Sequence, residues 1–222
     1  MDNILRILIL VSLAVSYIFR RKFNSYSACQ LRANLSGAEI AERMLQEYGI
    51  DHVKITCTQG HLTDHYNPED RTVNLSESVY FEKSAAAAAV AAHECGHAVQ
   101  HAQGYPFLRL RSAIVPMLSA VSPFIPWTII LGLALAHTTW IPFQIGVALY
   151  ALTTLFSLVT LPVEFDASRK ALAWMDRQSV VTSQERQIAK SALWWAAMTY
   201  VIAALFALIQ LMRLMGIGRE RK

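Results

Sequence analysis

The chain has 222 residues, of which 54% are hydrophobic and 16% are charged. These proportions exclude an ordinary soluble domain and indicate a small domain joined to membrane spans. The net charge of +4 suits loops beside anionic lipid, and no basic stripe is interleaved with aromatic residues, so we expect no nucleic-acid partner. The three cysteines form no C-x-x-C pair, which favours a reducing compartment.

Residues 1–22 are predicted to form an N-terminal membrane anchor. An apolar run from Ile7 to Phe19 is followed at once by Arg20, Arg21 and Lys22, with no small-residue cleavage site. The basic residues place the following segment in the cytoplasm by the positive-inside rule. We therefore expect a multi-pass protein of the cell (inner) membrane whose site faces the cytoplasm.

Residues 23–112 are expected to form a catalytic α+β segment. Ser36 and Glu39 have the spacing of a capping box, which opens an amphipathic helix that ends at Gly49. Alternating apolar and polar residues predict a strand at 53–57 and a pair of strands on either side of the turn at 67–70. A small sheet of this kind could hold an extended peptide along its edge.

The most informative stretch is the string H-E-x-x-H inside the alanine-rich residues 84–103. Alanine is the strongest helix former, so these residues predict a helix, on which His93 and His97 lie one turn apart on one face. Both imidazoles can then reach one metal ion. Glu94 lies between them as the natural general base once zinc has lowered the pKa of a bound water. The alternative is a helix whose histidines merely face water.

Two further regions are apolar enough to cross a bilayer. Residues 113–163 contain no Asp, Glu, Lys or Arg, and they predict a transmembrane hairpin with a turn near residues 137–140. Prolines in its first half predict a kink there: Pro116, Pro123 and Pro126. Residues 191–222 predict a C-terminal span and a basic tail, for a total of about four transmembrane helices. Four crossings would place this basic tail outside the cell, against the positive-inside rule, so the side of the C-terminus stays open.

Residues 164–190 are predicted to form a helix that carries a third metal ligand. A catalytic zinc usually takes three protein ligands, and Glu164 is the best candidate, because a carboxylate at the membrane boundary needs a partner. The alternative is an ion pair of Glu164 with Arg169 or Lys170. Asp166 could instead be the ligand, or accept a hydrogen bond from a ligand histidine.

Three other groups are less informative. His61, Asp64 and His65 lie near a turn, where such residues more often hydrogen-bond locally than bind metal. His101 is too far along the helix to share an ion with the first histidine of the motif, and we expect it to support the site or to lie at the surface. Cys95 points to a different side of the helix and is predicted to pack in the core.

The sequence resembles membrane gluzincins of the HtpX type and, more closely, the bacterial YugP-like family of neutral zinc metallopeptidases. The similarity covers most of the chain. Its stretches are Leu35–Glu39, Leu62–Tyr66, Leu75–Glu77, the helix with the H-E-x-x-H string, and Leu161–Ser168. The resemblance implies one zinc ion per chain bound by His93, His97 and Glu164, with Glu94 as base and a polypeptide as substrate.

The expected fold is therefore a mainly α membrane protein with about four transmembrane helices and a small α+β zincin-like, or minigluzincin, catalytic domain. HtpX-type enzymes carry an aspartate four residues after the ligand glutamate, whereas this chain has Ser168 there. That substitution leaves open whether Asp166 or Ser168 orients a ligand histidine.

Two other functions remain open from the sequence alone. One is an intramembrane zinc protease, although the spans offer no Asp ligand. The other is a zinc-stabilised membrane scaffold without activity, which would not need Glu94. Tyr66, His65 and Arg169 are candidates for stabilising the oxyanion, while natural substrate and oligomeric state cannot be inferred.

Overall fold

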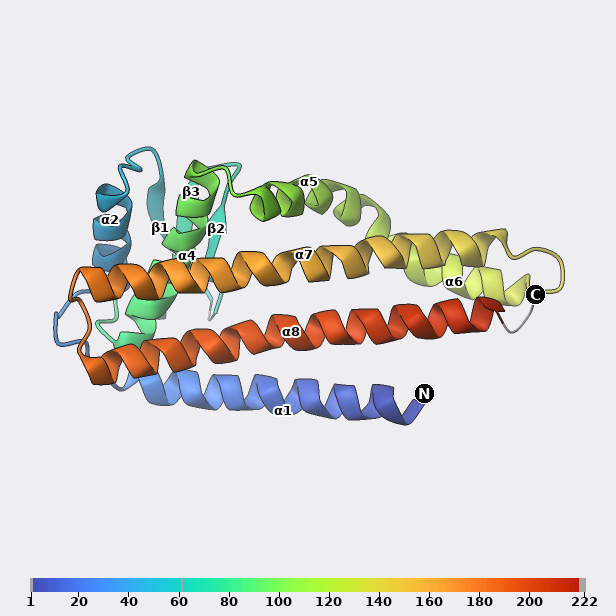
Figure 1. Cartoon of the computed structure of the whole chain (residues 1–222), viewed down its shortest axis with the longest axis horizontal. Coiled ribbons are helices and arrows are strands. Elements are labelled where there is room, and N and C mark those ends of the chain that lie inside the picture. The colour runs from blue at the N-terminus through green and yellow to red at the C-terminus, as the bar shows by residue number, and fades with distance from the viewer. Residues whose placement is uncertain (1, 61, 220–222) are drawn as a thin grey trace.

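A computed structural model describes residues 2–60 and 62–219. Three long helices run side by side, α1 (Asp2–Ser27), α7 (Ile141–Arg177) and α8 (Ser183–Arg219), with α8 packed between the other two (Figure 1). The short elements gather at one end of this bundle, which we call the compact end. The described ends of α1 and α8 nearest the two termini lie at the other end of the bundle.

Within the described residues, three helical segments are long and apolar enough to cross a membrane: Pro106–Ala134, Ile141–Arg177 and Ser183–Gly218. The predicted turn between the two arms of the apolar hairpin is confirmed, since no helix covers residues 135–140. The expected total of four spans stays a prediction, and α1 would be the fourth. Its exposed apolar side chains include Ile7, Leu10 and Leu13.

The first of these segments is broken, as its prolines predicted. It consists of α5 (Pro106–Val121), the 3-10 turn η1 (Ser122–Phe124) and α6 (Ile125–Ala134). Proline has no backbone N–H to donate. Two of the three prolines fall in the first turn of η1 and of α6, where backbone N–H groups have no partner within the helix anyway.

One expectation about helix boundaries is wrong. Glu164 was expected at the start of a separate helix, but it lies inside α7, which continues without interruption from the membrane hairpin into the compact end. Pro162 does not end α7. α7 has 37 residues, which corresponds to a length of about 55 Å, whereas roughly 20 residues are enough to cross a bilayer.

The compact end contains α2 (Gly37–Glu47), a three-stranded sheet, α3 (Glu77–Tyr80) and α4 (Ala85–Ala102). The capping box is confirmed: the Ser36 backbone N–H donates to Glu39 over 2.7 Å, and the Glu39 N–H donates back to the Ser36 hydroxyl over 3.3 Å. Ser84 caps α4 by accepting from the Ala87 N–H over 3.1 Å. These caps fix where both helices begin.

The sheet has the order β1-β3-β2, formed by β1 (Lys54–Thr58), β2 (His65–Asn67) and β3 (Thr72–Ser76). The two strands around the predicted turn pair antiparallel, as expected, whereas β1 pairs parallel to β3. β2 is therefore an edge strand, and it packs beside α4. The alanines of α4 are almost all buried, so α4 is the central element of the compact end.

Candidate metal centre

The centre is built where α4 crosses α7 at close range. A Cβ atom on Gly96 would lie 2.7 Å from the carbonyl oxygen of Ala167, so only glycine permits this approach. The contact brings the turn of α4 that carries His93 and His97 against the turn of α7 that carries Glu164. The middle residue of the motif thus has a packing reason to be glycine.

The three expected ligand residues come together in space. Nε2 of His93 lies 3.3 Å from one carboxylate oxygen of Glu164, and Nε2 of His97 lies 3.8 Å from the other. Their ligand atoms all lie within 4.8 Å of one another, so this group could hold one metal ion. All three side chains are buried or nearly so.

The alternative ion pairs of Glu164 do not form. Arg169 and Lys170 both pair with Asp166 instead. A different cation approaches Glu164: the guanidinium of Arg111, on α5, donates to its Oε1 over 3.0 Å.

Asp166 contributes through a glutamine that the sequence analysis missed. The Nε2 group of Gln100, a fully buried side chain, donates to Asp166 and to the carbonyl of Val163, each over 2.9 Å. Its Oε1 therefore faces Nδ1 of His97, 3.0 Å away, and must accept a hydrogen bond from the Nδ1–H group. This hydrogen bond leaves Nε2 of His97 unprotonated and free to bind a metal.

Ser168 makes the matching contact on the first histidine. Its hydroxyl lies 3.1 Å from Nδ1 of His93, on the side of the ring away from Glu164. On the question left open by the sequence, the structure gives these contacts: Ser168 lies directly beside His93, and Asp166 is linked to His97 through Gln100. Both imidazole rings are held with Nε2 turned toward the carboxylate.

Burial changes the proton affinity of the α4 side chains. It raises the pKa of Glu94 to about 7, because the charged carboxylate loses its hydration. Burial lowers the pKa of His97 to about 4, which keeps its imidazole neutral and able to donate a lone pair. A carboxyl group with a pKa near neutrality can both accept and return a proton.

A cavity of about 650 Å³ opens onto this group. The β2 residues His65 and Tyr66 form one wall, and the α5 residues Arg111 and Val115 form part of another. The hydroxyl of Tyr66 is hydrogen-bonded to His101 over 2.8 Å, so His101 supports the cavity wall rather than the metal group. Arg169, offered as an oxyanion stabiliser, is not among the lining residues and is 78% exposed.

Comparison with known proteins identifies the class. The family model described as "Putative neutral zinc metallopeptidase" matches residues 2–219. The chain belongs to this family. It is also 37% identical over 204 residues to the "Putative membrane protease YugP" of Bacillus subtilis (strain 168), which covers 90% of either protein. No solved structure matches the chain. The resemblance to the neutral zinc metallopeptidases is thereby confirmed.

The residues present fit the metal of this family. Ligand nitrogens and oxygens bound to one tetrahedral zinc ion lie about 3.3 Å apart, since each is about 2.0–2.1 Å from the metal. The separations of 3.3 and 3.8 Å join the two imidazoles to different oxygens of Glu164, and the ligand atoms all lie within 4.8 Å of one another, so a modest shift of these side chains would bring them to that value. Two imidazoles and one carboxylate are also a donor set that zinc accepts in catalytic sites.

The other metal-ligand candidates have different roles. The Asp64 carboxylate accepts hydrogen bonds from the backbone and hydroxyl of Ser76. Nδ1 of His65 lies 2.8 Å from the Thr63 carbonyl, and His61 lies outside the described residues. Cys95 is fully buried with its sulfur 3.6 Å from the Ala41 carbonyl, which confirms that it packs in the core.

Two residues of the site were missed because no local pattern marks them. Arg111 comes from the helix after the motif, and Tyr200 comes from the middle of α8; both line the cavity. Gln100 had a weak signal, since it lies three residues after His97 and therefore on the same helix face.

Proposed function

We propose that this protein is a membrane-embedded zinc-dependent metallopeptidase that hydrolyses peptide bonds. In this proposal His93, His97 and Glu164 hold one zinc ion, and Glu94 is the general base. The observation that carries it is the grouping of three ligand residues, whose ligand atoms all lie within 4.8 Å of one another and could hold one metal ion, beside a cavity that Glu94 also lines. A structural zinc site would fill its fourth position with protein and would not need this buried carboxylate.

Each residue has a distinct task in the reaction. When bound, zinc polarises the scissile carbonyl and makes a water molecule acidic enough to be deprotonated near neutral pH. Glu94 takes the proton from that water onto its carboxylate and later delivers it to the leaving amine nitrogen. Gln100 and Ser168 hold the two imidazole rings in place, and Arg111 fixes one oxygen of Glu164.

The sheet supplies a place for the substrate backbone. β2 is an edge strand and its residues line the cavity, so an extended peptide can pair with its free edge through main-chain hydrogen bonds. The cavity is also large enough for several residues of a peptide.

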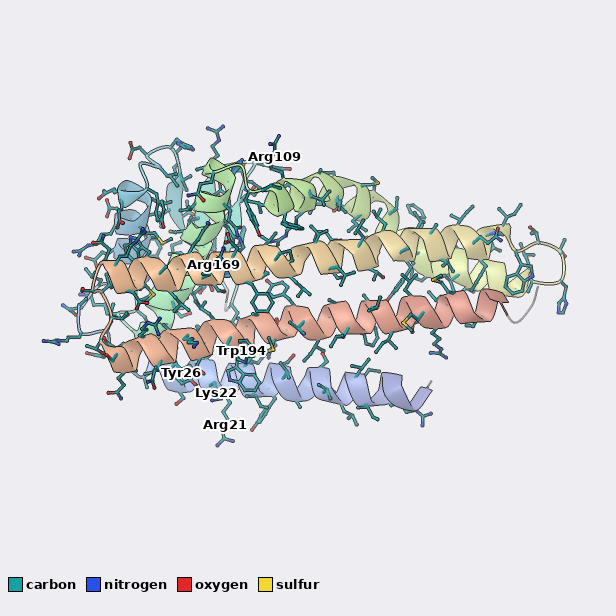
Figure 2. The ribbon with its side chains drawn as sticks, in the orientation of Figure 1. Arg21, Lys22, Tyr26, Arg109, Arg169 and Trp194 are labelled. Atoms are coloured by element: carbon teal, nitrogen blue, oxygen red, sulfur yellow. The ribbon has the colours of Figure 1, made fainter. Side chains whose placement is uncertain are left out.

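We place the site at the cytoplasmic boundary of the cell membrane. Basic and aromatic residues from different helices lie at a similar level along the bundle, near the compact end: Arg21, Lys22, Tyr26, Arg169 and Trp194 (Figure 2). Such residues prefer the interface between lipid and water, and basic residues prefer its cytoplasmic side. In this orientation α1 is a fourth span and the compact end, with its sheet, lies in the cytoplasm.

Metal content and peptide cleavage together test this function. The full chain in detergent is compared with Glu94→Gln, Glu164→Ala and the exposed control Glu82→Gln, for bound zinc and for cleavage of casein or of itself. We expect Glu94→Gln to keep zinc but lose about 100- to 10,000-fold in rate, since it removes the general base. Glu164→Ala should lose zinc, and Glu82→Gln should match the wild type.

Other outcomes contradict specific parts of the proposal. Full zinc in Glu164→Ala would remove Glu164 from the ligand set. A wild-type protein that holds zinc but cleaves nothing would support the scaffold role instead.

A further inference from the structure

A second, smaller cavity adjoins the metal centre on the side of the membrane helices. It has a volume of about 180 Å³ and shares Asp64, His93, Glu94, Glu164 and Tyr200 with the larger cavity. Its other walls come from α1, α4, α7, α8 and the segment before β2, and we call it the side pocket. The side-pocket residues used below are Phe19, Val90, Leu193, Ala196 and Ala197.

The two cavities extend in opposite directions along α4. The larger cavity reaches His101, toward the C-terminal end of the helix, whereas the side pocket reaches Val90, toward its N-terminal end. Glu94 and the first ligand histidine lie between. A peptide whose scissile bond is held at the metal centre can therefore place a neighbouring side chain into the side pocket.

The size of the side pocket fits one side chain. Sites for whole small molecules usually occupy about 300–1,000 Å³, more than this cavity provides. Alanines on α8 keep it open: Ala196 and Ala197 form one wall where a larger residue would fill the space.

The walls favour an apolar occupant. Most polar groups that line the side pocket have partners already: Ser168 contacts His93 over 3.1 Å, Thr199 donates to the Ala196 carbonyl over 2.6 Å, and the Asp64 carboxylate accepts from Ser76. Apart from these and the residues shared with the larger cavity, the walls are aliphatic or aromatic. A polar side chain would lose its hydration there without replacement, while an apolar one gains by leaving water.

The side pocket also adjoins a groove on the outer surface of the long helices. A groove between α7 and α8 shares Ser168, Leu193 and Ala197 with it, and its other lining includes Phe165 and Trp194 beside charged residues such as Lys190. These two aromatic side chains are 40% and 54% exposed, and Trp194 lies on α8 near the compact end (Figure 2). Through these shared residues the side pocket thus adjoins a groove on the outer surface of α7 and α8.

We propose that the side pocket binds one apolar side chain of the substrate next to the scissile bond, and that the substrates are apolar polypeptide segments at the membrane surface. This inference rests on the proposed peptidase function and adds the substrate class to it. The membrane helices α1 and α8 then anchor the protein and also select the substrate.

Binding of a matched pair of zinc-directed peptide analogues tests the side pocket. The probes are two peptide hydroxamates that differ only in one side chain, isobutyl or hydrogen, and their Kd values are measured on the zinc-loaded full chain in detergent. We expect the wild type to bind the isobutyl compound about 10-fold more tightly or better, as burial of a leucine-sized group permits. Ala196→Leu fills the side pocket and should abolish that preference by weakening the binding of the isobutyl compound.

Two further variants complete the test, one as a control for damage to the fold and one that changes the size of the side pocket. Ala203→Leu places the same side chain on the exposed face of α8, away from both cavities, and should keep the wild-type preference. Val90→Ala enlarges the side pocket and should shift the preference toward a benzyl or larger side chain.

The outcomes separate this inference from the proposed function. Equal binding of both compounds by the wild type, or an unchanged preference in Ala196→Leu, overturns the side pocket alone. Binding of neither compound by zinc-loaded protein overturns the side pocket and the metal site together. The expected preference in a protein that cleaves no peptide would support the side pocket and count against hydrolysis.

Discussion

The two ends of α7 illustrate how differently the two regions of the molecule use apolar residues. Toward Arg177, α7 lies in the core of the compact end, where Ala167, Ala171 and Trp174 are buried almost completely. Toward Ile141, large apolar side chains such as Leu155 are exposed. Glu164 lies at the change between these surroundings, so the metal centre sits where the packed domain meets the membrane bundle.

The compact end and the bundle also differ in how their buried polar groups are hydrogen-bonded. In the compact end, Gln100 satisfies both ends of its amide through His97, Asp166 and a backbone carbonyl. In the bundle, Oε1 of Gln210 is buried without a hydrogen-bond partner among the described residues. The compact end therefore holds its ligand residues in one arrangement, whereas the bundle tolerates a buried polar atom without a partner. Comparable substitutions should therefore destabilise the metal centre when made in the compact end and have little effect when made in the bundle.

The largest difference is expected between two glycines. Gly96→Ala forces a Cβ atom against the backbone of Ala167, which cannot rotate away, and should cost about 3 kcal/mol by overpacking. Gly216→Ala meets no atom within 4 Å and should stabilise α8 by roughly 0.5–1 kcal/mol. Thermal unfolding in detergent gives the stabilities, and metal analysis gives the zinc content, which should fall only in Gly96→Ala.

A wild-type melting temperature and full zinc in Gly96→Ala would mean that α4 and α7 can separate without loss of the centre. The close crossing would then not be what brings the ligands together.

A pair of glutamines should give a smaller contrast. Gln100→Leu leaves His97 and Asp166 without their buried partner, which should cost about 2 kcal/mol and lower the zinc affinity about 10- to 100-fold. Gln210→Leu removes a buried oxygen that has no partner among the described residues, so it should be neutral or stabilising. Chelator competition measures the affinity and denaturation measures the stability.

If both variants lost the same stability and zinc affinity, buried polar groups would not differ in importance between the compact end and the bundle. A stable Gln100→Leu variant with normal zinc affinity would show that the orientation of the His97 ring does not depend on this amide.

Local signals predicted much of this arrangement. The caps at Ser36 and Ser84 fixed two helix starts, and the spacing of His93 and His97 put both on one face of α4. These features depend on residues within one or two turns, which is why sequence alone suffices for them. The position of Glu164 beside them was expected from the membrane boundary and from the family resemblance, and the structure brings the three residues together.

Contacts between distant segments could not be predicted in this way. The approach of Arg111 to Glu164, the contribution of Tyr200 and the parallel pairing of β1 with β3 join residues whose proximity depends on the whole fold. The continuity of α7 was also missed, because a proline normally ends a helix, whereas tertiary packing overrides that preference at Pro162.

The smallest contrast compares two serines of α7, one in each region. Ser168→Ala removes the hydroxyl beside Nδ1 of His93 and should lower zinc affinity about 10-fold, with less than about 1 kcal/mol of lost stability. Ser157→Ala removes a hydroxyl that donates to the Thr153 carbonyl of its own helix, over 3.1 Å, and should leave zinc affinity unchanged. Chelator competition on both variants measures the difference. If the two retain equal affinity, the hydroxyl of Ser168 does not hold the ring, and the fixed geometry of His93 must come from packing of α4 against α7 alone.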